Sequence, residues 1–195
     1  MFDIKIDSAS LQNAVNYAQR QITFACAAGL SKTVKDIQDE LRQQLPDRFT
    51  IRTSWVARGI QISTASKANL SAAVRVMDPF MEAQETGGLK RSQAGRAMGI
   101  PVGARATPTD VTRPTNYPGR MLQRPGYFIA PLRTGSPVKA VWRRIGKGKT
   151  TRVKLMYVFS HAVRIKPRFE FVKTATSVAL RQFPRRFAEV LQSAL

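Results

Sequence analysis

A long, regular row of apolar residues near the N-terminus constrains this chain more than any other feature. Between Ser8 and Leu45 these residues recur every three or four positions, the spacing that places side chains on one face of an α-helix. Asp7 or Ser8 can cap the first turn, and Pro46 restricts the residue before it, so we expect one helix over residues 8–45. The row consists of Leu11, Val15, Ala18, Ile22, Cys26, Leu30, Val34, Ile37 and Leu41.

The predicted helix is too long for the core of one small domain. At 1.5 Å per residue it reaches roughly 55 Å, about twice the width of such a domain, so its apolar face extends beyond its own core. Gly29 is the weakest helix former between Ser8 and Leu45. Two interpretations follow. Either the helix bends at Gly29 around its own core, or a neighbouring molecule covers the excess apolar face.

The chain is strongly basic. It has 32 lysines and arginines against 12 acidic residues, a net charge of +20. Self-repulsion on this scale indicates a partner that neutralises it, which can be nucleic acid, an acidic protein surface or anionic lipid. We expect no membrane-spanning segment, because no apolar run approaches 18 to 20 residues. Residues 1–7 alternate like a short strand and lack the apolar region of a signal peptide, so we expect a cytoplasmic chain.

Most of the excess charge lies in one part of the sequence. Eighteen lysines and arginines but a single acid, Asp110, lie between Gly87 and Phe169. Proline and glycine are frequent in the same stretch, and they predict an irregular basic arm over residues 88–126. Structureless loops of this length are uncommon in compact domains. The arm is therefore expected to be either mobile or ordered by a partner, and we favour ordering by its neighbours.

The remaining patterns predict an α+β fold. We expect a long N-terminal helix and a C-terminal helix that pack on a mainly antiparallel sheet, with the arm inserted into a single domain of residues 1–195. Pro184 is expected to kink or split the C-terminal helix. The other expected elements are a three-stranded meander (49–53, 59–64 and 71–77), a short helix (79–85), a strand (127–132), a basic hairpin (140–145 with 151–158) and the C-terminal helix (169–195).

Signals of catalysis or metal binding are weak. Cys26 is the only cysteine and His161 the only histidine, which excludes a disulfide framework and a zinc site built from cysteine and histidine within one chain. Residues 146–151 contain glycine, lysine and threonine but lack the spacing of a phosphate-binding loop. Glu82 and Glu85 are most simply a solvated helix face. We expect no catalytic residue, no metal and no cofactor, and hence no enzyme.

The basic region allows two interpretations. As a nucleic-acid surface, its arginines would pair with phosphates, and Tyr117, Tyr127, Phe128 and Trp142 would be candidates for stacking on bases. As a protein-docking surface, the same charges would meet an acidic ring or tube, and the arm would wrap around a neighbour. Dispersed arginine with interspersed proline fits docking or sequence-independent phosphate contact better than base readout.

Three short motifs, taken in order, resemble a known family. They are Trp55–Ile60 with its Arg-Gly-Ile turn, Gln84–Arg91 with the pattern Gln-Glu-x-Gly-Gly-x-Lys-Arg, and Ile100–Val102 with Ile-Pro-Val. A basic middle and an apolar C-terminal helix follow. This order resembles tailed-phage neck and tail proteins of the minor tail protein Z type, and the resemblance covers most of the chain.

The resemblance implies a non-enzymatic virion protein of a tailed bacteriophage. It would belong to the neck or tail-top ring that completes the tail and joins it to the head connector, after assembly in the cytoplasm of the bacterial host. Terminator and completion roles both remain open. The implied partners are copies of itself in a ring of about six, the tail tube or terminator protein, the connector or stopper protein and the end of the packaged DNA, but no membrane.

The expected contact residues lie in one turn and in the basic hairpin. From the residues alone, the alternative function is sequence-independent nucleic-acid binding by the basic arm and the hairpin. The candidate contact residues are Gln84, Glu85, Lys90, Arg91, Arg143, Arg144, Lys147, Lys149, Arg152 and Lys154.

Overall fold

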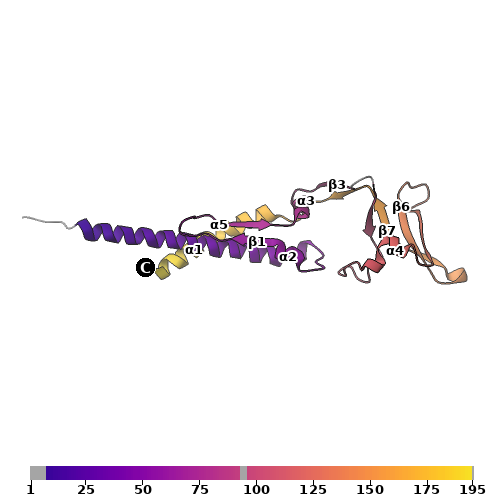
Figure 1. Cartoon of the computed structure of the whole chain (residues 1–195), viewed down its shortest axis with the longest axis horizontal. Coiled ribbons are helices and arrows are strands. Elements are labelled where there is room, and N and C mark those ends of the chain that lie inside the picture. Colours follow the sequence, from indigo (N-terminus) through magenta and orange to yellow (C-terminus); the bar gives the residue numbers. More distant parts are fainter. Residues whose placement is uncertain (1–7, 93–95, 195) are drawn as a thin grey trace, which may run out of the picture. The chain divides into compact units, whose positions relative to one another are not determined.

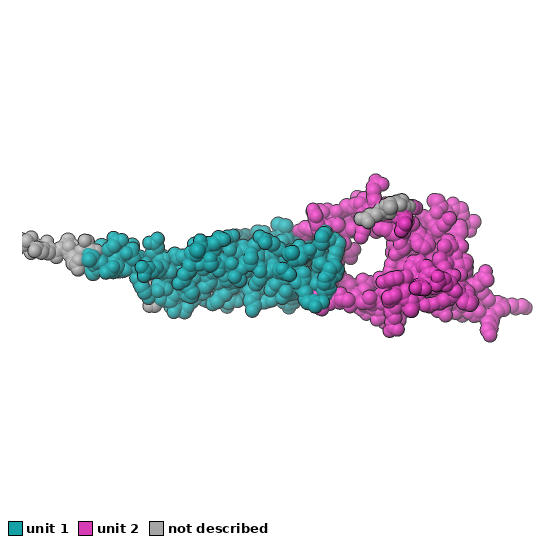
Figure 2. All heavy atoms as spheres, in the orientation of Figure 1, with its two compact units in different colours: residues 1–48, 55–81, 169–195 teal, residues 49–54, 82–168 magenta. Residues whose placement is uncertain are grey.

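A computed structural model describes residues 8–92 and 96–194. The chain divides into two compact units, coloured separately in Figure 2. Unit 1 comprises residues 1–48, 55–81 and 169–195, and unit 2 comprises residues 49–54 and 82–168. The predicted α+β class is confirmed by a long N-terminal helix, a C-terminal helix and antiparallel sheets. The single-domain organisation stays a prediction, and the strand expected over residues 1–7 lies outside the described residues.

Unit 1 is built on two antiparallel helices, α1 (Ser8–Arg48) and α5 (Phe171–Ala194) (Figure 1). Both are longer or more regular than their prolines predict. α1 continues through Pro46 to Arg48, so the expected stop at Leu45 is wrong. Of the kink or split expected at Pro184, the split is absent, because α5 is continuous there. Packing of the two helices against each other stabilises α5 enough to offset the hydrogen bond that Pro184 cannot donate.

Gly29 allows the two helices of unit 1 to approach closely. α1 is a continuous helix through Gly29, and a Cβ atom built there would lie 3.2 Å from both N and Cα of Phe187 on α5. The glycine is therefore needed for a close contact between helices, and α1 does not break at this position. The adjoining core is formed by Ala25, Val34, Ile37, Leu41 and Leu45 of α1 and Val178 and Val190 of α5, all buried.

A small two-stranded sheet packs beside α1 in unit 1. β1 (Ile60–Ser63) pairs antiparallel with β2 (Ala73–Val76). The predicted three-stranded meander is wrong, because residues 49–53 form no strand and α2 (Trp55–Gly59) occupies the space between. Arg42 of α1 donates to the carbonyl oxygens of Ala57 (2.9 Å) and Ile60 (3.0 Å), so it satisfies one carbonyl near the end of α2 and one at the start of β1. The short 3₁₀ helix η1 (Pro79–Met81) follows β2.

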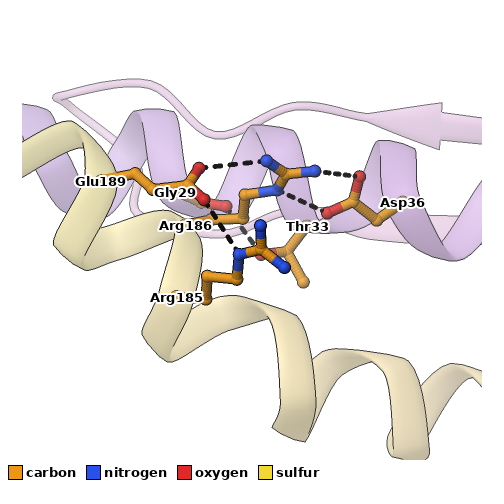
Figure 3. Close-up of polar contacts among 6 residues, drawn as sticks. All are labelled: Gly29, Thr33, Asp36, Arg185, Arg186 and Glu189. Atoms are coloured by element: carbon orange, nitrogen blue, oxygen red, sulfur yellow. Dashed lines mark hydrogen bonds and ion pairs between the residues drawn. The ribbon is translucent and has the colours of Figure 1, made fainter.

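An ion-pair cluster joins α1 to α5 (Figure 3). The guanidinium of Arg186 donates two hydrogen bonds to the carboxylate of Asp36, at 2.8 Å from Nε and 3.0 Å from Nη2. A third bond from Nη1 reaches Glu189 at 3.0 Å, and Arg185 Nε donates to the same carboxylate at 3.0 Å. The hydrogen bonds from Arg186 and then Arg185 lower the pKa of Glu189. The cluster fixes the rotation of α5 on α1.

Acid is expected to weaken unit 1 through Glu189. Because folding lowers the pKa of this carboxyl from its ordinary 4.5, its contribution to stability is present above pH 4.5 and is lost as pH falls through the folded-state pKa. We expect Glu189→Gln to lower the Tm at pH 7 and to match the unsubstituted protein at pH 2, measured by circular dichroism. Glu82→Gln, at an exposed position, should have no effect at either pH. A Tm difference that persists at pH 2 would contradict a charge effect.

Unit 2 contains a four-stranded antiparallel sheet with the order β4-β7-β6-β5. The predicted basic hairpin is confirmed as β6 and β7. A separate pair joins β3 to β8, so the segment after Phe159 turns away from β7 at His161 instead of simply extending it. The strands are β3 (Gly88–Arg91), β4 (Met98–Pro101), β5 (Tyr127–Pro131), β6 (Lys139–Ile145), β7 (Arg152–Ser160) and β8 (Ala162–Ile165).

The basic arm is more ordered than predicted. Among its described residues, 88–92 and 96–126, it contributes β3, β4 and two short helices, and the described segments that connect these elements from residue 96 on are irregular. Buried Ala104 and Met121 from the arm pack with Val141, Met156 and Tyr157 of the sheet to form the core of unit 2. The short helices of unit 2 are α3 (Glu82–Thr86), η3 (Pro114–Asn116), α4 (Pro118–Met121) and η4 (Gly148–Thr150). None of the helices in the described residues is both long and apolar enough to cross a bilayer.

Candidate functional site

The positive charge of the chain is concentrated in unit 2. This unit has 19 lysines and arginines against three acids, Glu82, Glu85 and Asp110, which leaves +16 of the total +20. One-to-one pairing with its own acids can therefore neutralise only three of the nineteen cations. Unit 1 is nearly balanced, and it includes the ion pairs of Arg186 with Asp36 and Glu189. Unit 2 is thus the part of the chain that carries most of the uncompensated positive charge.

A basic cavity lies at the surface of unit 2. It has a volume of about 570 Å³, and all of its charged lining residues are cations. We call this cavity the basic hollow and define it by the five basic residues Arg105, Arg124, Arg143, Arg144 and Lys154. The nearby Asp110 lines a separate, smaller cavity and accepts the backbone N–H of Thr107 at 2.9 Å. Its carboxylate therefore serves a local turn.

The β-hairpin supplies three of the five cations. Arg143 on β6 lies directly opposite Lys154 on β7, and like charges in such cross-strand pairs repel each other. The guanidinium of Arg143 lies 5.5 Å from the ring centre of Tyr127, and that of Arg144 lies 5.1 Å from Phe128. These cation–π contacts orient both arginines without neutralising their charge. The hairpin therefore holds its cations together at an electrostatic cost.

The arm supplies the other two cations, and neutral oxygens orient them. Arg105 Nε donates to the hydroxyl of Thr112 at 2.7 Å, and Arg124 Nη2 donates to the carbonyl of Thr115 at 2.6 Å. A guanidinium has five N–H donors, and each of these bonds uses one. Since the acceptors carry no charge, both guanidinium groups keep their full charge toward the hollow.

Two hydrogen bonds, one within the arm and one between the arm and the sheet, hold the arm in place next to the hollow. Asn116 donates to the carbonyl of Ala104 at 3.0 Å, and the hydroxyl of Tyr157 donates to the carbonyl of Asn116 at 2.8 Å. Burial raises the pKa of Tyr157, although the charge of Arg105 opposes the shift, so its hydroxyl stays a donor at neutral pH. Gly103 lies close to β7, where a Cβ would come within 2.4 Å of the Leu155 carbonyl oxygen.

The structure brings together three of the ten predicted contact residues. Arg143, Arg144 and Lys154 line the basic hollow. Lys147, Lys149 and Arg152 are exposed on the same hairpin beyond it. The remaining four lie on α3 and β3 and do not line the hollow: Gln84, Glu85, Lys90 and Arg91. The backbone of Gln84 has a structural role, because its carbonyl accepts the N–H of Arg168 at 2.8 Å.

Sequence reasoning missed Arg105, Arg124 and Asn116 as lining residues. All three lie in the predicted irregular arm, where neither period 2 nor period 3.6 indicates which side chains share a face. Tyr127, predicted as a stacking group, does line the hollow, but the guanidinium of Arg143 lies over its ring. Within the described part of the chain, His, Cys, Asp and Glu do not gather into a group of three or more that could hold a metal.

A second notable surface lies on the N-terminal part of α1. All residues from Ala9 to Arg20 are exposed, and α5 ends before it reaches them (Figure 1). Four apolar residues here follow the alternating four-and-three spacing of a coiled-coil seam. We call them the exposed seam: Leu11, Val15, Ala18 and Ile22. Leu11 is 66% exposed and Ile22 48% exposed, so the excess apolar face predicted from the sequence is present.

The exposed seam lies on the same face of α1 as residues that pack against α5 further along the helix. The same spacing leads on to Ala25 and Gly29, which are buried on the side of α1 where α5 packs. Arg20 is the only charged residue from Ser8 to Ser31. A second helix could therefore pack on the seam without burying many charges.

Comparisons with protein-family models, with curated proteins and with solved structures found no match. The resemblance to tailed-phage proteins therefore rests on the short motifs alone.

Proposed function

We propose that the chain is a structural virion protein of a tailed bacteriophage, part of the neck or tail-top ring that completes the tail and joins it to the head connector. The observation that carries the proposal is the exposed seam of α1. Four apolar side chains at coiled-coil spacing, on a helix that extends beyond its own core, are typical of a surface that another subunit covers. The motifs that resemble minor tail protein Z indicate that this assembly is the neck or tail-top ring of a tailed phage.

In this proposal the two units serve different contacts. Unit 1 packs against copies of the same chain in a ring of about six, with the seam at the contact between subunits. Unit 2, with its charge of +16, meets an acidic surface of the tail tube, terminator or connector protein, or the end of the packaged DNA. The chain works by binding and needs neither a catalytic residue nor a cofactor. Its location is then the virion, after assembly in the host cytoplasm.

Deletion of the gene from the encoding phage tests the proposal. We expect electron micrographs of the lysate to show DNA-filled heads beside free tails of normal length, with very few joined particles. Wild-type protein supplied from a plasmid should restore joining. Tails of uncontrolled length would replace the completion role with a terminator role. Intact, infectious particles in the deletion lysate would overturn the structural proposal.

A further inference from the structure

We propose that the basic hollow of unit 2 binds phosphate groups of a nucleic-acid backbone without reading the base sequence. This inference does not depend on a phage role, because it rests only on the residues of unit 2. It names a site, five cationic side chains and a ligand chemistry.

The charge of the hollow requires an anion. Five cationic residues line a cavity of about 570 Å³, and none of the acidic residues in the described part of the chain lines it. Arg143 and Lys154 face each other across the hairpin, so part of this repulsion exists even without the arm. Such an arrangement destabilises the folded chain unless an anion binds. When the cations of the hollow neutralise phosphates of a nucleic acid, the counterions condensed on those phosphates are released, and this release strengthens binding at low salt.

The donors of the hollow are oriented in advance. Four of the five cations are arginines, whose planar fork matches two oxygens of one phosphate group. Thr112 and Thr115 hold Arg105 and Arg124, and the ring of Tyr127 holds the guanidinium of Arg143. The guanidinium of Arg144, the next residue on β6, lies over Phe128 on the other face of the sheet. None of these partners is charged. Binding therefore orders few additional side-chain rotamers, and this lowers its entropic cost.

The extent of the charge favours a polymer over a small anion. Beyond the hollow, the same hairpin carries exposed Lys147, Lys149 and Arg152, so the basic surface continues along β6, β7 and their connection. A chain of regularly spaced phosphates matches such a surface better than a single phosphate does. The hollow also lacks an open stacking platform, because Arg143 lies over the ring of Tyr127. The hollow would then contact the phosphate backbone of the nucleic acid and not its bases, so no base sequence would be preferred.

The test is binding of the full chain to a fluorescein-labelled 20-base-pair duplex of random sequence, followed by fluorescence anisotropy between 50 and 300 mM NaCl. We expect Arg105→Gln/Arg124→Gln to raise the Kd at least about tenfold and to reduce the slope of log K against log salt by about 2. The control Arg133→Gln/Arg164→Gln removes the same charge at exposed positions outside the hollow. It should change the Kd less than about threefold.

Three results would overturn the proposal. Equal losses in the two double variants would show that only the overall charge matters, and no binding of the duplex by the unsubstituted protein would exclude the ligand. Tighter binding of polyglutamate, lost in the same variant, would assign the hollow to an acidic protein. If Arg105→Gln/Arg124→Gln fails to fold, Lys154→Gln replaces it, with an expected slope change of about 1. If the hollow does not bind nucleic acid, the proposed assembly role is unaffected, because that role rests on the exposed seam of α1.

Discussion

Replacing Leu11 and Ile22 together by aspartate is expected to abolish the joining of heads to tails while leaving the chain folded. Both side chains are exposed in unit 1, so the free energy of unfolding should change by less than about 0.5 kcal/mol per site. In the assembled ring, however, each aspartate would lie in a contact between subunits without a cationic partner. An unpaired buried charge costs several kcal/mol, and the cost recurs in every subunit.

The measurement is complementation of the deletion phage, with joined particles counted by electron microscopy. Plasmid-borne Leu11→Asp/Ile22→Asp should give no more joined particles than the empty plasmid. The control Asn13→Asp/Asn16→Asp adds the same two charges to the other side of α1 and should restore joining as the wild type does. Full rescue by the seam variant would show that the seam is not an assembly contact.

Replacing Gly29 by leucine is expected to lower the free energy of unfolding of unit 1 by about 2 kcal/mol or more. A Cβ at this position would lie 3.2 Å from two backbone atoms of Phe187, which cannot rotate away. Overpacking of this kind costs about 1–3 kcal/mol, occasionally more, and three further carbon atoms place leucine at the upper end. The gain in helix propensity on replacing glycine, about 1 kcal/mol, offsets part of the loss.

Urea unfolding followed by circular dichroism at 222 nm measures this effect, because α1 and α5 supply most of the helical signal. Gly119→Leu is the matched control, since no atom lies within 4 Å of a Cβ built there. The control should unfold within about 0.5 kcal/mol of the wild type. A Gly29→Leu protein as stable as the wild type would mean that α1 and α5 do not pack closely at this position.

Local periodicity predicted the helices better than the sheets. The apolar row over residues 8–45 has one interpretation at that length, and the excess apolar face that it predicts is present in unit 1. Proline and glycine were poor guides to where the helices end, because tertiary packing overrides their local preferences. Pro184 lies inside α5, and Gly29 lies inside α1, where it allows a close contact with Phe187. That contact joins residues far apart in the sequence, so no local pattern reveals it.

The candidate site could be predicted only in part for the same reason. The hairpin sequence alternates, and the predicted hairpin is present, but the pairing of Arg143 with Lys154 is known only from the structure. The other half of the hollow comes from Arg105 and Arg124, which lie in irregular segments positioned by single hydrogen bonds to Thr112 and Thr115. Where the sequence has neither helix nor strand periodicity, the density of basic residues identifies the charged region but not which side chains line the hollow.

Cryo-electron microscopy of the purified phage particle tests the central claim most directly. The account predicts density for α1 in a ring at the head–tail junction, with Leu11 and Ile22 covered by a neighbouring subunit. Absence of the chain from the particle, or a ring in which these two side chains face solvent, would contradict it.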